Sequence, residues 1–342
     1  MADNSELKML KMLLKAGADP NLLDKNNKSP LMKAIDSCEP AMVKYLLSHG
    51  AMVGLKQVFS KHDLFLAIRQ GNLVRVKYLF KNHSADLLKY RNKDGDTALH
   101  IAAEFGQTAV VNFLLKSGAD INRKNNNGES ALHLAVASRK QTTVSLLLKR
   151  GASTNIRNSS GETPLHNSIW CKSLVEKLID AGSEVDARDN FGDSPLNHAV
   201  ESGCYGVVEV LTQNVAQFDS RGFYGQSALH KSVHSKKISE LLIRSGADVE
   251  AIDDYGNTPL IIAAECGDLS LIKLLINSGA DVNAVNDNGE SVLHKAVERM
   301  KLQIVATLLR AGARPDFQNN SGVTALHLAA DRLVDSDFSV TI

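Results

Sequence analysis

Histidine is the residue type in this chain that most invites a catalytic or metal-binding interpretation, because there are eleven copies. Six of them follow a serine or threonine by three residues, which places a hydroxyl and an imidazole on one helical turn. These six are His100, His133, His166, His230, His294 and His327. A nucleophile needs a base and a third group that orients the base. One pair repeated so often is more typical of helix capping, so we expect no catalytic residue.

The other histidines and the four cysteines show no pattern typical of a metal site. They are His49, His62, His83, His198, His234, Cys38, Cys171, Cys204 and Cys266. No C-x-x-C pair occurs, and no glycine-rich loop of the kind that holds a nucleotide is present. The sequence therefore predicts no metal, no cofactor and no enzymatic activity.

Cysteine usage, charge and hydropathy limit which cellular compartment and which classes of partner fit this chain. Unpaired cysteines are typical of a reducing compartment, which favours the cytoplasm, with the nucleus as an alternative. The net charge of +1 offers no excess of positive charge for nucleic acid. No apolar stretch reaches the roughly 18 residues of a membrane span, and lysines interrupt the apolar residues of the N-terminus. We expect neither nucleic acid nor membrane as the partner of this segment.

A four-residue motif recurs along the chain and must set the positions of these side chains. It reads Thr or Ser, a small or apolar residue, Leu, and usually His, and from Thr97 onward it returns every 31 or 33 residues. The copies begin at Ser29, Thr97, Ser130, Thr163, Ser194, Ser227, Thr258, Ser291 and Thr324. A hydroxyl at an N-cap accepts a hydrogen bond from an early backbone N–H, and proline is tolerated directly after it. Each copy therefore predicts the start of a helix.

The rest of each repeat follows the same physical logic. A short alanine-rich first helix leads through a turn to a second helix, which ends at a glycine such as Gly118. An extended finger then leads to a turn glycine such as Gly95, just before the next motif. The sequence predicts pairs of helices joined by finger loops.

This pattern, T-P-L-H-x-A with a 33-residue period, resembles that of the ankyrin-repeat family over nearly the whole chain. The resemblance implies an all-α solenoid with a helix-turn-helix and a finger, or β-hairpin loop, in each of about ten units. It also implies that the motif histidine is structural and ties the helix start to the neighbouring finger. For a single array over 1–342 we expect a half repeat at 1–28, repeats at 29–61, 62–96 (degenerate), 97–129, 130–162, 163–193, 194–226, 227–257, 258–290 and 291–323, and a half repeat with a tail at 324–342.

Several repeats depart from the pattern. The repeats that begin at Thr163 and Ser227 are two residues short, and we expect a tighter turn between their two helices. Val215 replaces a helix-ending glycine, so that corner must be built differently, and a kink or soft joint is expected near residues 51–62. The half repeats favour a segment of a longer chain, a truncated product, or ends that a partner covers.

One finger position carries a cation in five successive repeats. Four residues before the turn glycine, the column consists of Arg91, Lys124, Arg157, Arg188 and Arg221. It then continues as Ile252, Val285 and Gln318. The column is either a solvent-exposed position that is commonly basic, or a docking strip for a partner with an acidic surface.

Aromatic residues gather at the finger tips of the middle repeats. Directly before the turn glycine lie Phe191, Tyr224 and Tyr255, and Phe223 adds a fourth ring. Exposed aromatic side chains are enriched at binding hot spots, although aromatic finger tips are also common in this family. Trp170, the one tryptophan, lies beside a shortened turn. It either folds over that turn or anchors a partner.

The resemblance also suggests a modification. Asn21, Asn122 and Asn283 follow a leucine by eight residues and an aspartate by two. This pattern is similar to asparagines that are hydroxylated in other ankyrin repeats, and the alternative is a purely structural finger asparagine.

These features together predict a non-catalytic adaptor or scaffold that docks another protein on the finger tips and first-helix groove of its middle repeats. Two alternatives stay open. One is the substrate-recognition arm of a ubiquitin ligase, and the other is an ankyrin-type inhibitor or effector that acts on a signalling or transcription protein.

Overall fold

The computed structural model describes residues 5–26, 28–37, 39–51, 61–82, 85–214, 218 and 220–337. The chain divides into two compact units, Met1–Ser159 and Ser160–Ile342. Cys38, His83, Val215 and most of the segment in which we predicted a joint, 52–60, lie outside the described residues. Among the described cysteines, Cys171, Cys204 and Cys266 are thiols.

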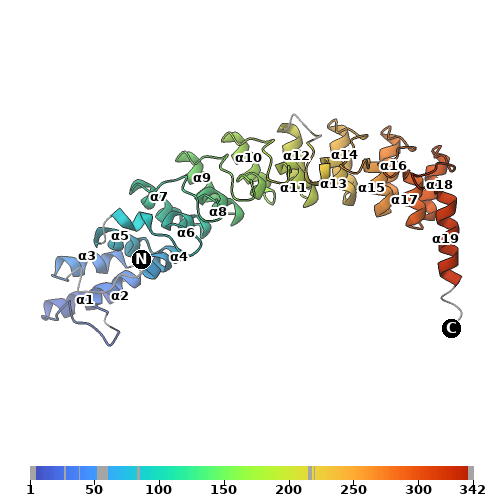
Figure 1. Cartoon of the computed structure of the whole chain (residues 1–342). Coiled ribbons are helices and arrows are strands. Elements are labelled where there is room, and N and C mark those ends of the chain that lie inside the picture. The colour runs from blue at the N-terminus through green and yellow to red at the C-terminus, as the bar shows by residue number, and fades with distance from the viewer. Residues whose placement is uncertain are drawn as a thin grey trace. The chain divides into compact units, whose positions relative to one another are not determined.

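The first unit is a stack of helix pairs (Figure 1). Its helices are α1 (Ser5–Lys15), α2 (Pro30–Asp36), α3 (Pro40–Ser48), α4 (Lys61–Arg69), α5 (Leu73–Asn82), the 3-10 turn η1 (Ala85–Lys89), α6 (Ala98–Glu104), α7 (Thr108–Lys116), α8 (Ala131–Ala137) and α9 (Gln141–Lys149). First helices pack on first helices, as α6 does on α8, and second helices on second helices, as α7 does on α9. The motif leucines Leu99 and Leu132 are buried between them.

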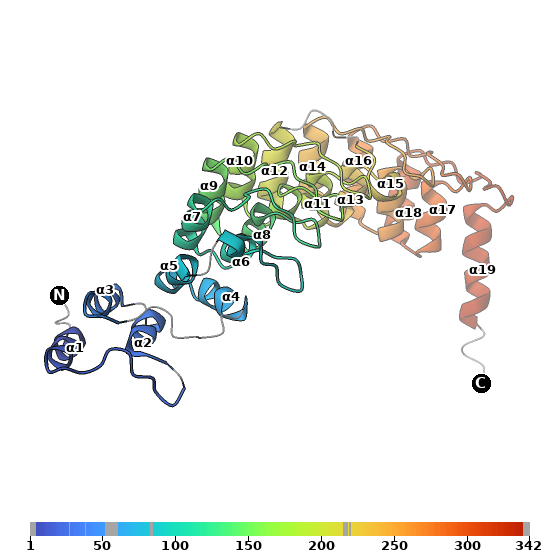
Figure 2. The same ribbon diagram turned by 60° about the vertical axis from the view of Figure 1, so that its left-hand side comes forward.

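The second unit repeats this arrangement. Its helices are η2 (His166–Ser168), α10 (Lys172–Asp180), α11 (Pro195–Glu201), α12 (Tyr205–Asn214), η3 (Phe223–Gly225), α13 (Ala228–Lys231), η4 (Ser232–His234), α14 (Lys236–Arg244), α15 (Pro259–Cys266), α16 (Leu269–Asn277), α17 (Val292–Glu298), α18 (Leu302–Arg310) and α19 (Ala325–Asp337). Figures 1 and 2 both show α10, α12, α14 and α16 in one row and α11, α13, α15 and α17 in another.

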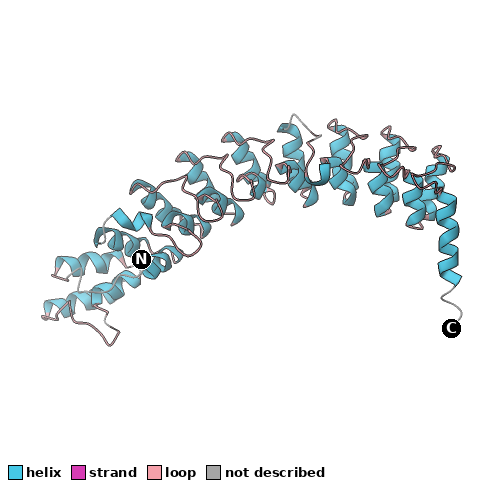
Figure 3. Cartoon of the chain, in the orientation of Figure 1, coloured by secondary structure: helices cyan, strands magenta, loops and turns pink. Residues whose placement is uncertain are grey.

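The described chain consists of helices joined by loops (Figure 3), with one isolated bridge between Val285 and Ser291. This confirms the predicted all-α solenoid. None of the helices in the described segments has the length and apolar character needed to cross a membrane.

Five of the six motif histidines are buried, as the structural interpretation predicts, whereas His327 in the last copy is exposed. Both ring nitrogens are bonded in His100, His166, His230 and His294. The backbone N–H of Thr97 donates to Nδ1 of His100 (3.2 Å), and His100 Nε2 lies 3.0 Å from the carbonyl oxygen of Glu129 in the next finger. His230 repeats this pattern with Ser227 (3.2 Å) and Asn257 (2.9 Å). Because Nδ1 accepts, Nε2 carries the proton, and each ring joins a helix start to the next finger.

The pH dependence of stability follows from these rings. Burial lowers the pKa of His100 and of His230 below the ordinary value of 6.5, so both stay neutral in the fold. Below pH 6.5 the unfolded chain therefore binds more protons than the folded chain, and the free energy of unfolding falls as the pH drops. Each ring contributes a slope of up to about 1.4 kcal/mol per pH unit.

Urea unfolding at a series of pH values from neutral to mildly acidic measures this slope. The variant His230→Gln, which does not titrate, is expected to show a shallower slope than the wild type. Equal slopes in the two proteins would contradict the prediction.

One of the two short repeats requires a correction. We expected an intact first helix followed by a tighter turn. In the repeat that begins at Thr163, the missing residues come out of the first helix itself. In the repeat that begins at Ser227 the turn is tighter as expected, because one residue separates η4 from α14, against three between α11 and α12. In one repeat that helix is the three-residue 3-10 turn η2, and in the other it is the four-residue α13 followed by η4. The first helix of a full-length repeat, such as α11, has seven residues. A 3-10 helix rises about 2.0 Å per residue, against 1.5 Å in an α-helix, so fewer residues cover a similar distance.

The turn glycines allow neighbouring fingers to touch. Gly256 has a φ of +73°, a left-handed conformation that favours glycine. A Cβ atom there would lie 2.8 Å from the backbone nitrogen of Asp287 in the next finger. That nitrogen donates to the carbonyl oxygen of Tyr255 (3.0 Å), so the finger tips are joined backbone to backbone.

Candidate functional site

Four aromatic side chains on three successive fingers of the second unit form one continuous row. The rings of Phe191 and Phe223 meet edge to face with centroids 5.5 Å apart. Phe223 contacts Tyr224 at 3.9 Å, and Tyr224 contacts Tyr255 at 5.9 Å. The structure thus brings together the aromatic residues that the sequence singled out. We call these four residues the aromatic finger surface.

The aromatic finger surface is exposed. The exposed fractions are 60% for Phe191, 42% for Phe223, 50% for Tyr224 and 55% for Tyr255. Contiguous exposed apolar side chains are typical of interaction sites, whereas single exposed apolar residues need no explanation. The ring contacts make this a patch rather than four unrelated exposures.

The finger that carries Phe223 is anchored on a buried carboxylate. Asp193 Oδ1 accepts from Asn197 Nδ2 (2.9 Å) and from the backbone N–H of Phe223 (3.3 Å), and Oδ2 accepts from Lys231 Nζ (3.0 Å). Burial alone would raise the pKa of Asp193, but the bonds from Asn197 and Lys231 outweigh it and lower that pKa. Asp193 is therefore a charged anchor for the finger.

Gly222 allows this anchor to form, and sequence reasoning missed it. A Cβ atom on Gly222 would collide with Asp193 Oδ1, so a residue with a side chain would push the finger away. Other fingers carry Asp or Asn at this position, for example Asp189 and Asp253. The glycine in that column was the signal in the sequence.

Tyr224 has a strained backbone. Its φ of +56° and ψ of +28° are left-handed, a conformation that costs a tyrosine about 1–2 kcal/mol. Its carbonyl oxygen accepts from the N–H of Asp254 (2.9 Å), and its ring contacts Phe223 and Tyr255. Strained residues of this kind cluster at binding sites.

The variant Tyr224→Gly separates folding from binding. Glycine adopts this backbone conformation without strain, which offsets the loss of the two ring contacts, so we expect the free energy of unfolding to change by no more than about 1 kcal/mol. We expect affinity for the partner to fall by about 10-fold or more, because the ring is lost from the middle of the row. Thermal unfolding and a binding titration measure the two effects. A variant that is destabilised while binding normally would contradict both expectations.

Trp170 lies apart from this row along the chain. The finger of this repeat leads into the start of η2, whereas Trp170 comes after the end of η2. The side chain of Trp170 is 57% exposed. Both alternatives, a side chain that folds over the shortened turn and a partner anchor, stay predictions. The structure does not place it in the aromatic finger surface.

The basic column serves first to join fingers. Lys124 Nζ donates to the carbonyl oxygen of Arg157 (2.7 Å), and Arg188 Nη1 donates to that of Arg221 (3.1 Å). Arg221 forms an exposed ion pair with Asp254 (2.7 Å). Arg91, Lys124 and Arg157 lie in the first unit, Arg188 and Arg221 in the second. A cation at this position therefore has a structural reason, and a docking role stays a prediction.

The same column becomes apolar further along the second unit. Ile252 is 52% exposed and Val285 is 43% exposed. Ile252 lies on the finger of Tyr255, so this finger presents both an aliphatic and an aromatic side chain. In the sequence, Ile252 follows the last cation of the basic column, and no apolar role was predicted for it.

The three asparagines of the hydroxylation pattern join repeats. Asn122 Oδ1 accepts from the N–H of Ser153, and Asn283 Oδ1 from that of Arg314, both at 2.9 Å. Asn21 Nδ2 donates to the carbonyl oxygen of Gly50 (3.0 Å). The preceding aspartates accept from the backbone N–H groups of these asparagines, which accounts for the spacing structurally. Hydroxylation stays a prediction.

Comparison with known families supports the repeat assignment along the chain. The family model described as "Ankyrin repeats (3 copies)" matches six overlapping segments. They are residues 1–87, 55–125, 119–189, 152–222, 213–286 and 260–336.

Individual proteins match over shorter stretches. The mouse B-cell lymphoma 3 protein homolog is 36% identical over 97 residues, 27% of this chain and 21% of that protein. Human neurogenic locus notch homolog protein 2 is 37% identical over 93 residues, 26% of this chain and 4% of that protein. The matches thus span about a fifth or less of these relatives. The crystal structure of the ankyrin repeat domain of Bcl-3 superposes with a TM-score of 0.55 at 32% identity, covering 61% of this chain and 98% of that domain.

Proposed function

Because this chain belongs to the ankyrin repeat family, whose repeats serve protein–protein interaction, we propose that it is a non-catalytic adaptor or scaffold that docks one protein partner on the aromatic finger surface. Contacts from Ile252 and Trp170 complete the docking region. Its working compartment is the cytoplasm or nucleus, which fits the free thiols.

The continuity of the aromatic rings carries this proposal. Hot spots are enriched in aromatic residues and lie together at the centre of an interface. Tyr and Phe supply large contact areas at a low cost in side-chain entropy, since each has two χ angles. The backbone links between finger tips and the Asp193 anchor hold the rings in place before a partner arrives, which reduces the ordering cost of binding.

The basic side chains add an electrostatic part to the proposal. Arg188 and Arg221 lie on the fingers of Phe191 and Phe223, so a partner with acidic residues beside its apolar contact fits this region best. Charge of this kind acts mainly on the association rate and on salt dependence. We expect a slower association rate at high salt, with little change in the dissociation rate.

A second candidate is an ankyrin-type inhibitor or effector that acts on a signalling or transcription protein. The likeness to Bcl-3, whose structure is titled as that of a member of the IkappaB protein family, favours it. Both candidates use a protein-binding surface, and they differ in whether the bound protein loses its own activity.

Differential capture tests the proposal. The purified chain, the double variant Phe223→Ser/Tyr255→Ser and the control Phe105→Ser are each immobilised and exposed to one lysate of the source cells. Phe105 is a matched control because it is 41% exposed and belongs to the first unit, whereas the aromatic finger surface belongs to the second. We expect mass spectrometry to find a protein that the wild type and the control retain and the double variant loses. Identical capture by all three would overturn the proposal.

A further inference from the structure

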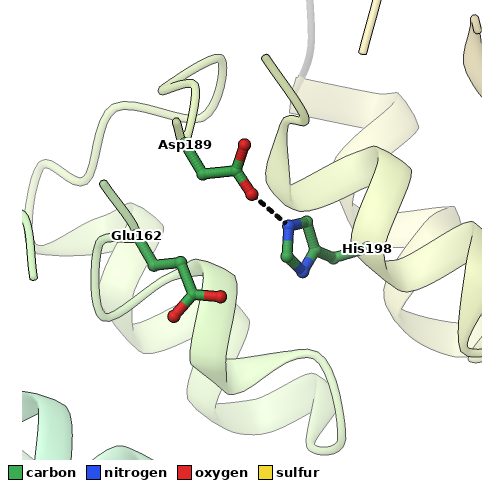
Figure 4. A group of neighbouring side chains, drawn as sticks. All are labelled: Glu162, Asp189 and His198. Carbon is green, nitrogen blue, oxygen red and sulfur yellow. Dashed lines mark hydrogen bonds and ion pairs between the residues drawn. The ribbon is translucent and has the colours of Figure 1, made fainter. Parts of the chain in front are cut away.

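Two carboxylates and an imidazole meet at the base of two fingers in the second unit. One ligand atom from each of Glu162, Asp189 and His198 lies within 4.8 Å of the other two. Glu162 directly precedes the Thr163 repeat, Asp189 lies in the next finger, and His198 lies in α11. Figure 4 shows both carboxylates pointing toward the imidazole ring from separate loops. Segments far apart in the sequence thus supply one nitrogen and two oxygen donors.

Asp189 is held in a position suited to binding a cation. Its side chain is only 2% exposed. Oδ1 accepts from the backbone N–H groups of Phe191 (2.8 Å) and Asp193 (2.9 Å), which fixes the carboxylate. Oδ2 faces His198 Nε2 at 2.9 Å. The second oxygen and the ring nitrogen thus face each other at hydrogen-bond distance, and a separation of about 3.3 Å would let both bind one tetrahedral ion.

Two other repeats of the second unit place lysine where this repeat has histidine. Four residues after the N-cap, Lys231 pairs with Asp193 (3.0 Å) and Lys295 pairs with Glu290 (2.6 Å). In those repeats a permanent cation neutralises the carboxylate at the finger base. His198 instead offers a lone pair when it is neutral, so two carboxylates beside it present a negative site with a nitrogen donor.

We propose that Glu162, Asp189 and His198 bind a divalent transition-metal ion, with zinc as the best fit. Zinc takes histidine nitrogen at about 2.0–2.1 Å and carboxylate oxygen at about 2.0–2.2 Å in a tetrahedral arrangement. The nitrogen donor selects zinc over magnesium or calcium, which prefer oxygen ligands alone. The three side chains leave a fourth position for water. The ion would join two fingers to α11. The spacing of the three ligands in the sequence does not predict such a site.

Zinc titration by calorimetry at neutral pH tests the site in the full chain. The key variant is His198→Lys, which introduces the residue that two other repeats carry at this position, Lys231 and Lys295, and is therefore expected to preserve the fold. We expect the wild type to bind one equivalent of zinc more than this variant. His234→Ala is the matched control, since His234 is exposed in η4 and outside the cluster. It should bind as many equivalents as the wild type.

Two further measurements keep the proposal falsifiable. Glu162→Gln should weaken the same equivalent by at least about 10-fold. Cobalt in place of zinc should give the visible absorption of a nitrogen- and oxygen-bound ion in the wild type and not in His198→Lys. Equal zinc stoichiometry in the wild type and His198→Lys would overturn the proposal. It would mean that His198 only pairs with Asp189, in the way that Lys231 pairs with Asp193 and Lys295 with Glu290.

Discussion

Replacing Phe223 and Tyr255 together by serine is expected to weaken binding of the protein partner by at least about 100-fold, or about 3 kcal/mol, while the chain stays folded. Phe223 touches both Phe191 and Tyr224, and Tyr255 ends the row, so the double change breaks the patch at its centre and its edge. Truncation of one central aromatic residue commonly costs about 2 kcal/mol or more, and neighbouring hot spots are not additive.

The fold is expected to survive because the rings are exposed and the finger is held by its backbone. The N–H of Phe223 donates to Asp193 whatever its side chain is, and the N–H of Asp287 still reaches the carbonyl oxygen of residue 255. The loss of ring contacts costs about 0.5–1.5 kcal/mol each. A binding titration with the captured partner, with circular dichroism as the folding check, measures the effect. Full affinity in a folded double variant would show that the aromatic finger surface does not bind the partner.

Replacing Lys231 by methionine is expected to lower the free energy of unfolding by about 3–5 kcal/mol. Lys231 Nζ bonds Asp193 Oδ2, and the side chains of these two residues are only 7% and 9% exposed. The substitution leaves a buried carboxylate without its cation. The second pair of Lys231, with Glu201 at 3.4 Å, is 69% exposed on the glutamate side and adds little.

A double variant shows whether Lys231→Met is destabilised by the unpaired buried charge of Asp193 or by the loss of packing around the lysine side chain. In Asp193→Asn/Lys231→Met both charges are gone, and the amide of residue 193 still accepts a hydrogen bond from Asn197 or Phe223. Removing both partners of a buried pair is often close to neutral, so we expect most of the lost stability to return. Urea unfolding compares the wild type, Lys231→Met and the double variant. A double variant as unstable as Lys231→Met would show that the lysine stem, rather than its charge, stabilises the unit.

The Lys231→Met variant also links stability to the proposed function. Asp193 anchors the finger of Phe223, so a disturbed carboxylate is expected to release that finger and weaken partner binding in the folded fraction. The double variant should recover binding together with stability, because the amide oxygen introduced at position 193 can still accept from the N–H of Phe223. If stability recovered without binding, or binding without stability, the Asp193 anchor would not be what holds the aromatic finger surface in its binding conformation.

Much of the architecture followed from local rules in the sequence. Hydroxyl caps, the prolines that follow them and the leucine of each motif predicted where helices begin, and α6, α8, α11, α15 and α17 begin there. The structural role of the motif histidines was also predictable, since the cap and the ring share one helical turn. The shortened repeats were visible as missing residues, but whether the helix or the turn would absorb the loss depended on packing against neighbours.

The sequence by itself determined the repeat, the all-α class, the helix starts and the identity of the aromatic residues on the fingers. These are set by interactions within about 33 residues, so they repeat with the period of the chain. The tertiary structure alone decided that Phe191, Phe223, Tyr224 and Tyr255 touch, that Gly222 lets a finger close on Asp193, and that Glu162, Asp189 and His198 converge. Each of these joins side chains from different repeats, and small changes in finger conformation decide such distances. A periodic pattern fixes which residues share a column, whereas only the packed fingers fix which of them meet.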